Sequence, residues 1–483
     1  MKAVEKFKRQ ESETDRYSKG TYLSISFGNL ITEFFIVAFG SRVFDFYENE
    51  IGLQSKWISG AIILYALWNM FNDPIIGYIS DKPRKWWKKY GKRRPWILGA
   101  IIPIGISLVL IFAVPPFDPE QGAIWLTLWL LISSIIYDTC FSIFGTNFMG
   151  LLPEKFRSDK ERRRQATIGI SFSTVGMVLG TMLPSIIGDY NNQATWLLGA
   201  GITSIVGIGF GMLMWWGTIE PPEMIDRTEH CVDEIIHEKE EVREEEKYPL
   251  FSTLKTAFKD KNYMSYLILI VCYQCLTLMM VGSIPYLNRF IITVDGVQSP
   301  IKEYLLFLPA VVVGLLSIPA VNWLTRKIGS PKMVILGGIL IICSGIPFLF
   351  ISNYIVVMSC IAIMAVAQIT FGLQLQPILG DVMDELVAKI GKRQEGLITG
   401  IRTFFARMGL IIQALTFWII HELTGFTPGG ETQDALASLG LRFQLALVPT
   451  IIMGIGIFLF WRLYDIDAKK KSMIRGALSK MKL

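Results

Sequence analysis

Long apolar stretches separated by short polar segments repeat along the whole 483-residue chain. About twelve of these stretches reach the roughly 20 residues that an α-helix needs to cross a bilayer. Strands of a membrane barrel would instead alternate over about 10 residues. The pattern therefore predicts an all-α polytopic membrane protein with twelve transmembrane helices, which begin near Thr21, Ser55, Trp96, Ile124, Ala166, Thr195, Asn262, Tyr304, Met333, Asn353, Gly396 and Gln444.

One long polar segment, which contains EKEEVREEEKYP, separates six apolar stretches from six others. Such a charged segment is typical of a solvated linker between two domains. We therefore expect five parts: a cytoplasmic N-terminal segment (1–20), a six-helix bundle (21–218), a cytoplasmic linker (219–261), a second six-helix bundle (262–464) and a cytoplasmic basic tail (465–483).

The charges support this topology. Only 18% of the residues are charged, against about 25% in soluble domains. Most Lys and Arg residues lie in the termini, the linker and alternate loops, whereas PPFDPEQGA, DYNNQAT and TGFTPGGETQDALASLG contain none. Because translocated short loops avoid positive charge, we expect a multi-pass cell-membrane protein with both termini in the cytoplasm. The net charge of +6 then reflects topology, and we expect no nucleic-acid partner.

The two halves repeat their basic loops. GYISDKPRKWWKKYGKRRPWILGAII follows the second span, and the shorter VNWLTRKIGSPKMVILGGIL follows the eighth. DKERRRQATIGI and AKIGKRQEGLITGI form a second pair. Internal duplication of this kind is typical of secondary transporters, and six plus six spans with a central linker resemble the major facilitator superfamily.

Two ionisable residues fall near the middle of predicted spans, Glu33 in the first and Arg407 in the eleventh. A charge at that depth is costly unless it is paired or hydrated, so each is a candidate functional residue. Carboxylate and guanidinium groups suit a polyhydroxyl ligand. The alternative is a permanent ion pair between the two halves.

In the second span, Asn69, Asn72 and Asp73 are spaced i, i+3 and i+4 and so share one helical face. A carboxylate and two amide oxygens can replace the water shell of a small cation, since hard ions prefer oxygen ligands. The sequence therefore predicts a cation site here. The alternative is that Asp73 only forms a helix-breaking turn with Pro74.

Asp81 ends the second span, directly before a basic loop that includes Arg93. We expect the two to belong to a conformation-dependent charge network that gates the transporter, the alternative being a solvated surface charge. Asp138 and Arg402 are further charges within spans, without an assigned partner. His421 lies near the outer end of span eleven, away from the position of a central proton relay.

Two segments carry a specific resemblance, WNMFNDPIIGYISDKPRKWWKKYGKRRPW and ILGDVMDELVAKIGKRQEG. They are similar to signatures of the glycoside-pentoside-hexuronide:cation symporters, the melibiose permease-like family of the major facilitator superfamily. The resemblance implies that Glu33 binds sugar, that Asp73 and Ser142 bind the cation, that Arg407 replaces a lysine beside the cation site, and that Thr403 is a polar neighbour one turn earlier.

The sequence also departs from this family. Asn69 stands where sodium-coupled sugar members have a second acidic residue, and Gly145 where span four supplies a carboxylate. Met149 takes the place of a sugar-stacking tryptophan.

The predicted function is cation-coupled symport of a sugar or sugar derivative by alternating access, with Na⁺ or H⁺ as the coupling ion. We expect substrate binding by Glu33, Arg402, Thr403 and Arg407, a monomer in the lipid bilayer, and no other cofactor. Because no nucleophile with a nearby base and no phosphate-binding glycine loop occurs, we expect no enzymatic activity. Two alternatives are a cation-coupled carrier of a lysophospholipid or other amphiphile and a non-transporting membrane sensor.

Overall fold

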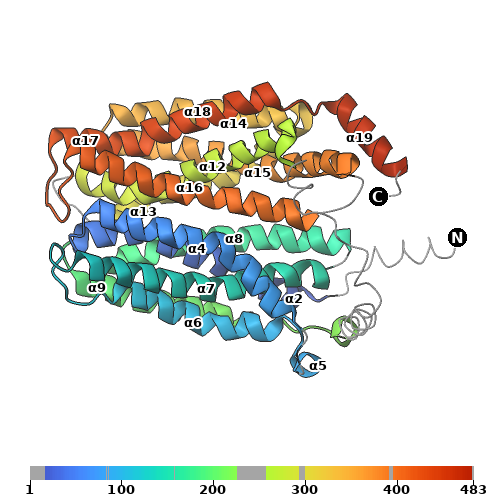
Figure 1. Ribbon diagram of the computed structural model, residues 1–483, viewed down its shortest axis with the longest axis horizontal. Coiled ribbons are helices and arrows are strands. Elements are labelled where there is room, and N and C mark those ends of the chain that lie inside the picture. Colours follow the sequence, from blue (N-terminus) through green and yellow to red (C-terminus); the bar gives the residue numbers. More distant parts are fainter. Residues whose placement is uncertain are drawn as a thin grey trace. The chain divides into compact units, whose positions relative to one another are not determined.

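A computed structural model describes residues 17–82, 84, 86–156, 158–225, 257–292, 300–390 and 395–480. Within these ranges the chain is built from helices, with no β-structure beyond one isolated bridge between Asp189 and Asn192 (Figure 1). Eleven of the described helices are long and apolar enough to cross a membrane. The predicted all-α membrane fold is confirmed.

The predicted second span is the helix that falls outside this set of eleven. It forms α4 (Ser55–Asp81), whose 27 residues are ample for a crossing. Its mean hydropathy is lowered by the polar residues near its middle, Asn69, Asn72 and Asp73. The helix continues through Pro74, so the alternative that Asp73 is part of a helix-breaking turn is wrong.

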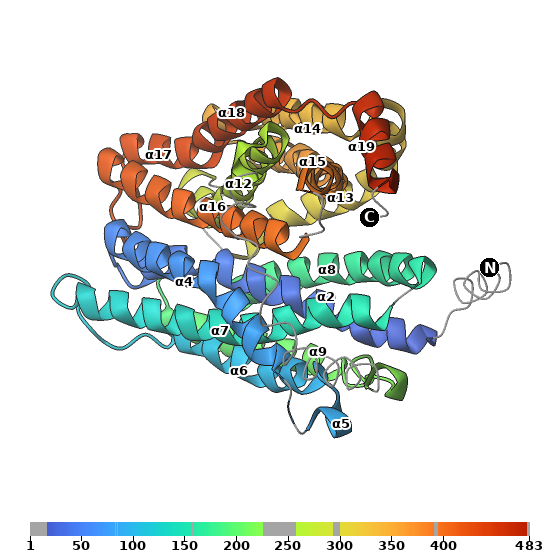
Figure 2. The same cartoon turned by 45° about the vertical axis from the view of Figure 1, so that its right-hand side comes forward.

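The described residues fall into two compact units. The first unit contains residues 17–43 and 67–225. In Figures 1 and 2 its helices are coloured from blue to green. They are α2 (Lys19–Gly40), the second part of α4, α5 (Trp87–Tyr90), α6 (Arg94–Phe112), α7 (Ala123–Lys155), α8 (Asp159–Ile187) and α9 (Gln193–Met212).

Helices α2 and α8 pack together at unusually close range within the first unit. Gly176 and Gly180 lie one turn apart on α8, and a Cβ atom at these positions would sit 2.1 Å from the backbone oxygen of Leu30 and 2.4 Å from that of Phe34. Small residues at this spacing let two membrane helices approach backbone to backbone. Only glycine therefore fits at these two positions of α8.

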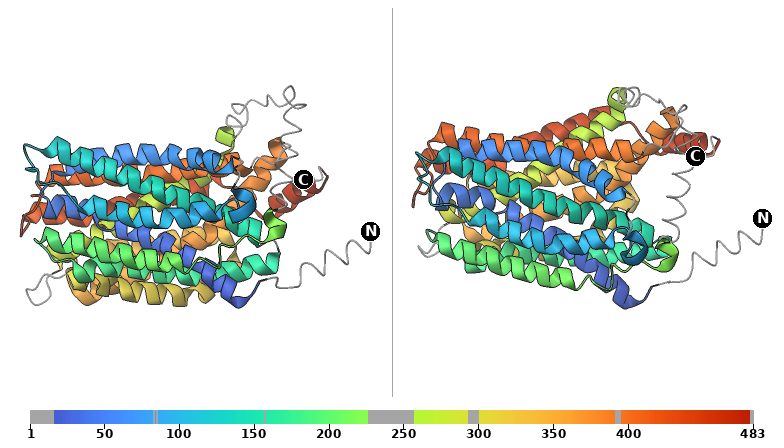
Figure 3. Two further views of the ribbon diagram at one scale, coloured as in Figure 1. Left: turned by 90° about the horizontal axis from the view of Figure 1, so that it is seen from below. Right: turned by 60° about the horizontal axis from the view of Figure 1, so that its bottom comes forward.

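The second unit contains residues 44–66 and 257–480 of the described chain. The elements of this unit are coloured yellow-green to red from α12 onward and blue at residues 44–66 in Figure 3. They are the π-helical turn η1 (Phe46–Glu50), the first part of α4, α12 (Lys261–Tyr286), η2 (Leu287–Ile291), α13 (Pro300–Ile328), α14 (Ser330–Gly345), η3 (Ile346–Leu349), α15 (Tyr354–Ile390), α16 (Glu395–Thr424), α17 (Ala435–Arg442), η4 (Phe443–Leu447), α18 (Val448–Leu463) and α19 (Ala468–Lys480). The short α3 (Val43–Asp45) lies at the junction of the two units.

Most helices begin within a few residues of the predicted positions, but the last span begins at Ala435 rather than near Gln444, and α8 begins seven residues earlier, at Asp159. Ser158 and Glu161 form a reciprocal capping box there. The box stabilises a polar first turn that hydropathy does not detect. Most of the predicted linker, including His230 and His237, lies outside the described residues.

Candidate functional site

Hydrogen bonds between side chains tie α4 to α7 within the first unit. Asn69 Nδ2 donates to Asp138 Oδ1 over 2.6 Å, and the Ser142 hydroxyl donates to Asp73 Oδ1 over 2.6 Å. The partners in both pairs are 69 residues apart in sequence, so the two helices run in the same direction with a constant register. Because each pair lies one turn from the other, the bonds form two successive rungs between the helices.

The rung formed by Asn69 and Asp138 includes a second amide. Asn72 Nδ2 donates to Asp138 Oδ2 over 3.0 Å, so each carboxylate oxygen of Asp138 accepts one amide hydrogen. Asn69, Asn72 and Asp138 are all buried. Since both NH₂ groups face Asp138, the carbonyl oxygens of the two amides are directed away from it. Asp138 thereby fixes the orientation of two of the predicted cation ligands.

The rung formed by Asp73 and Ser142 contains the other two predicted ligands. Asp73 is half-buried and Ser142 is buried. A serine hydroxyl that donates to a carboxylate keeps its lone pairs for a second partner. The two rungs thus place carboxylate, amide and hydroxyl oxygens along one short stretch of two membrane helices, which is the donor set that a small hard cation prefers. A proton on Asp73 would neutralise the same carboxylate.

The predicted solute-binding residues are divided between the units. Glu33 is half-buried on α2 of the first unit. On α16 of the second unit, Arg402 Nε donates to the hydroxyl of Tyr266 over 2.9 Å, and Thr403 donates to the backbone oxygen of Thr399 over 3.1 Å. Arg407 lies on the same helix and is half-buried. The Glu33–Arg407 pair stays a prediction.

The predicted gating residues meet at the end of α4. Lys92 Nζ lies 2.7 Å from Asp81 Oδ1, and Arg93 lies 3.7 Å from the same oxygen. Arg93 also forms a 2.6 Å ion pair with Glu154 on α7. Burial opposes the charge of Arg93, but Glu154, Asp81 and Glu220 outweigh it, so the pKa of Arg93 is raised. The sequence identified Asp81 and Arg93 but not the two glutamates.

Glu220 caps the start of α6. Its carboxylate accepts hydrogen bonds from the backbone N–H groups of Lys92, Arg93 and Arg94 at 3.0, 2.7 and 3.0 Å. Gly91 makes this approach possible, because it has a φ of +85° and a Cβ there would lie 2.5 Å from Glu220. The negative charge also suits the helix N-terminus. Glu220 thus links the Asp81–Arg93 network to the chain that follows α9.

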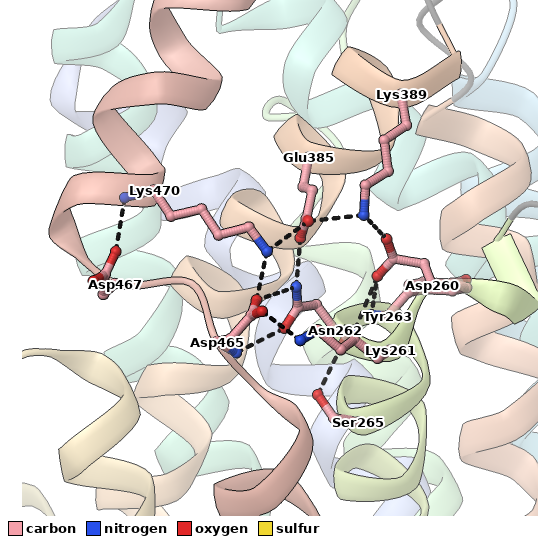
Figure 4. A network of polar contacts seen from close by, with 10 residues as sticks. All are labelled: Asp260, Lys261, Asn262, Tyr263, Ser265, Glu385, Lys389, Asp465, Asp467 and Lys470. Carbon is pink, nitrogen blue, oxygen red and sulfur yellow. Dashed lines mark hydrogen bonds and ion pairs between the residues drawn. The ribbon is translucent and has the colours of Figure 1, made fainter.

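A second charge network joins three segments of the second unit (Figure 4). Asn262 Nδ2, at the start of α12, donates to Glu385 over 2.7 Å and to Asp465 over 2.8 Å. Lys470 on α19 reaches the same two carboxylates. Burial acts against the charge of Asp465, but hydrogen bonds from Lys261, Lys470 and Asn262 outweigh it and lower the pKa of Asp465.

This network, also supported by Lys389 bridging Asp260 and Glu385, was not predicted. Two of its members, Glu385 and Lys389, lie in the recognised segment ILGDVMDELVAKIGKRQEG. Glu385 contacts Asn262 at the start of α12 and Lys470 at the start of α19, which are distant in sequence. Glu385 therefore connects α15 to two other helices of the same unit.

Comparison with known proteins decides the family. The family model described as MFS/sugar transport protein matches residues 20–468, nearly the whole chain. This chain belongs to the MFS/sugar transport protein family. The resemblance inferred from the loop segments is thereby confirmed, and the family is one of membrane transporters.

Individual relatives of this MFS sugar-transport chain are distant. It is 21% identical to the lactose permease of Lactobacillus helveticus, covering 94% of this chain and 71% of the relative. It is 20% identical to sodium-dependent lysophosphatidylcholine symporter 1 of Gallus gallus, covering 87% and 82%. Among solved structures, the xylose transporter XylE of E. coli aligns with a TM-score of 0.63 at 12% identity, over 94% of this chain and 98% of XylE. The last match supports the fold.

Proposed function

We propose that this chain is a cation-coupled symporter of a sugar or sugar derivative. The observation that carries the proposal is the pair of rungs between α4 and α7, with Ser142 bonded to Asp73 and both amides bonded to Asp138. A packed pair of membrane helices gains little from so many polar groups unless they have a functional role. A bound cation would lower the electrostatic cost of the carboxylates and give them that role.

In the proposed mechanism Asp73, Ser142, Asn69 and Asn72 hold the cation, while Glu33, Arg402, Thr403 and Arg407 hydrogen-bond the solute. Neutralising Asp73 lowers the cost of moving the loaded protein between its two access states. Moving one cation through the membrane potential supplies about 2.3 kcal/mol per 100 mV. At one-to-one coupling this corresponds to roughly 50-fold accumulation of solute.

Either Na⁺ or H⁺ is compatible with this donor set. Oxygen ligands suit Na⁺, and a proton on Asp73 would serve the same electrostatic purpose. Asn69 replaces an acidic residue found in sodium-coupled relatives, whereas Asp138 places a carboxylate on the facing helix, opposite Asn69. We propose that this carboxylate compensates for the substitution.

A carrier of lysophospholipids is the second candidate. The relative from Gallus gallus is named a lysophosphatidylcholine symporter. Met149 on α7 is 53% exposed, at the position where the sugar-transporting relatives have a stacking tryptophan. A flexible, apolar thioether suits an acyl chain better than a sugar ring.

We further propose that the chain acts as a monomer in the cell membrane, with its termini and central linker in the cytoplasm. The proposed six-helix bundles comprise residues 21–218 and 262–464, although residues 44–66 of the first bundle fall in the second compact unit. In this orientation the network around Asp81 and Arg93 lies at the cytoplasmic end of the first unit. Making and breaking its ion pairs would gate that end.

The test is a ligand-induced thermal shift of the purified protein with lactose, xylose, melibiose and lysophosphatidylcholine, each with and without Na⁺ and at two pH values. If the chain is a sugar symporter, at least one sugar should stabilise it, and the size of this stabilisation should depend on Na⁺ or on pH. Stabilisation by lysophosphatidylcholine alone would favour the second candidate. No response to any solute, combined with a full response to cations in Asp73→Asn, would overturn the proposal.

A further inference from the structure

A buried carboxylate and a buried histidine meet within the second unit. Glu48, in the π-helical turn η1, has no exposed surface, and His421 on α16 is also buried. His421 Nδ1 lies 2.9 Å from Glu48 Oε1. The Tyr286 hydroxyl donates to Glu48 Oε2 over 2.5 Å, and the Ser55 hydroxyl donates to Oε1. Three elements of the second unit therefore converge on the Glu48 carboxylate.

The other ring nitrogen of His421 also faces an oxygen. His421 Nε2 lies 2.8 Å from Gln444 Oε1, and Gln444 Nε2 donates to the Ser283 hydroxyl over 3.1 Å. The carboxylate and the amide oxygen are both acceptors, whereas a neutral imidazole has only one N–H group. Only the doubly protonated ring donates to both partners. The geometry therefore fits an imidazolium paired with a carboxylate.

The surroundings favour a cation at this position. The ring of Phe426 stacks on His421 with a centroid distance of 4.3 Å and an angle of 20°, and a cation over an aromatic face is stabilised electrostatically. The neighbouring buried charges, Arg289 and Glu50, already pair with one another over 2.6 Å. A protonated His421 gives Glu48 a counter-charge at 2.9 Å.

The remaining charged or titratable groups on the elements packed around this cluster differ in exposure. Lys56 and Glu422 are exposed, and Arg442 donates to backbone oxygens of Phe348 and Ile351. The buried Asp45 accepts a hydrogen bond from Asn49 over 2.8 Å. Among the described residues, the charged or titratable groups of η1 and of the nearest turns of the elements around it are Asp45, Tyr47, Glu48, Glu50, Lys56, Tyr286, Arg289, His421, Glu422 and Arg442.

The position of Glu48 in the chain gives the cluster a mechanical consequence. Residues 44–66 pack in the second unit, although the chain on both sides of them belongs to the first unit. Any relative movement of the two units must bend the chain at these junctions or detach the segment from α12 and α16. The bonds of Glu48 and Ser55 hold the segment in place.

We propose that Glu48 and His421 form a proton-binding site that latches residues 44–66 onto the second unit. With the proton bound, the ion pair and both hydrogen bonds of the ring are complete. Loss of the proton leaves a buried carboxylate without its counter-charge and one ring nitrogen facing another acceptor. Such a buried, uncompensated charge is strongly destabilising. Acidic conditions therefore keep the latch closed, and raising the pH releases it.

The test uses the full chain in lipid nanodiscs, labelled with ¹⁵N-histidine. The chain has three histidines, so the signals of His421 are identified by their loss in His421→Gln. The proposal predicts that both ring nitrogens carry protons while the latch is closed, and that Glu48→Gln removes one of these protons under the same conditions. A ring with one unprotonated nitrogen at every pH from 5 to 9 would overturn the proposal, because it corresponds to a turned Gln444 amide and a neutral histidine.

Hydrogen–deuterium exchange of the peptide covering residues 44–55, corrected for the pH dependence of intrinsic exchange, measures the latch itself. We expect protection to fall on the order of tenfold as the pH rises, with the same midpoint as the loss of the ring proton. In His421→Gln the protection should no longer depend on pH, whereas His237→Gln should behave like the wild type. Constant protection while His421 loses its proton would also overturn the proposal. Neither measurement depends on the proposed transport activity, since no solute is present.

Discussion

The hydroxyl of Ser142 donates a 2.6 Å hydrogen bond to Oδ1 of Asp73, joining α7 to α4. The two residues are 69 positions apart in sequence, and one turn away Asn69 bonds to Asp138 with the same separation. This repeated register places the polar residues of two membrane helices opposite one another. The cation chemistry proposed for the protein rests on that arrangement.

Removal of the Ser142 hydroxyl should weaken cation binding. A hydrogen bond to a charged group contributes about 1.5–3 kcal/mol, so Ser142→Ala should raise the cation concentration for half-maximal thermal stabilisation by roughly tenfold or more. Ser133→Ala is the matched control, because the buried Ser133 hydroxyl bonds only to backbone oxygens of its own helix among the described residues. Equal responses from the two variants would remove Ser142 from the site.

The pair of Asn69 and Asp138 should tolerate exchange better than loss. Asp138→Asn alone leaves amide groups facing amide groups, and Asn69→Asp alone places two carboxylates together. The double variant restores one carboxylate and one amide across the helices, and Asn72 can still donate to the amide oxygen at position 138. We expect each single variant to lower the melting temperature and the double variant to recover most of the loss, with a coupling energy of about 0.5–3 kcal/mol. Additive losses would show that the pair is not coupled.

A carboxylate at position 145 should strengthen the response to Na⁺. Gly145 lies one turn beyond Ser142 on α7, and a Cβ there would have its nearest contact, a Phe141 carbon, at 4.0 Å, so the first atom of a side chain is accommodated at this position. Gly145→Asp should lower the Na⁺ concentration needed for stabilisation, because a further anionic ligand raises affinity for a hard cation. Gly145→Asn controls for shape without charge. An identical Na⁺ response in both variants would contradict the prediction.

The network at Asp465 should contribute to stability in a pH-dependent way. The pKa of Asp465 is lowered in the folded protein. The stability that its ionised form contributes is therefore complete above the pKa of an unfolded aspartate, about 3.9, and is lost as the pH falls toward the lower pKa of the folded state. Because the Asp465 side chain is 42% exposed and solvent screens its ion pairs, Asp465→Asn should cost no more than about 1 kcal/mol at pH 7. The difference in melting temperature from wild type should shrink as the pH is lowered from 5 to 3. An exposed control, Glu431→Gln, should show no such trend, and a constant difference for Asp465→Asn would contradict the assignment.

The sequence predicts the membrane fold well, because the hydrocarbon thickness demands long apolar segments that stand out along the chain. It also places Asn72 and Asp73, at i+3 and i+4, on the helical face of Asn69, since the spacing within a single helix is fixed. Asp138 could not be paired from spacing alone. Its partners lie on another helix, and their contact depends on the register and rotation of α4 against α7.

Contacts between distant segments also explain why the sequence does not predict the roles of Glu220 and Glu48. Glu220 acts on three backbone N–H groups near Arg93, and backbone partners leave no signal in side-chain spacing. The sequence places His421 near the end of its span, where α16 has it, but its contact with Glu48 joins residues 373 positions apart. Polar residues that a hydropathy profile registers only as interruptions thus prove to be the points where helices are tied together.

Solute uptake into proteoliposomes under an imposed inward gradient of Na⁺ or H⁺ tests the central claim most directly, with the sugar that stabilises the purified protein as the labelled solute. We predict accumulation above the external concentration only when the cation gradient is present, and its loss in both Glu33→Gln and Asp73→Asn, while Asp118→Asn in an exposed loop transports normally. Undiminished accumulation by both Glu33→Gln and Asp73→Asn would contradict the account.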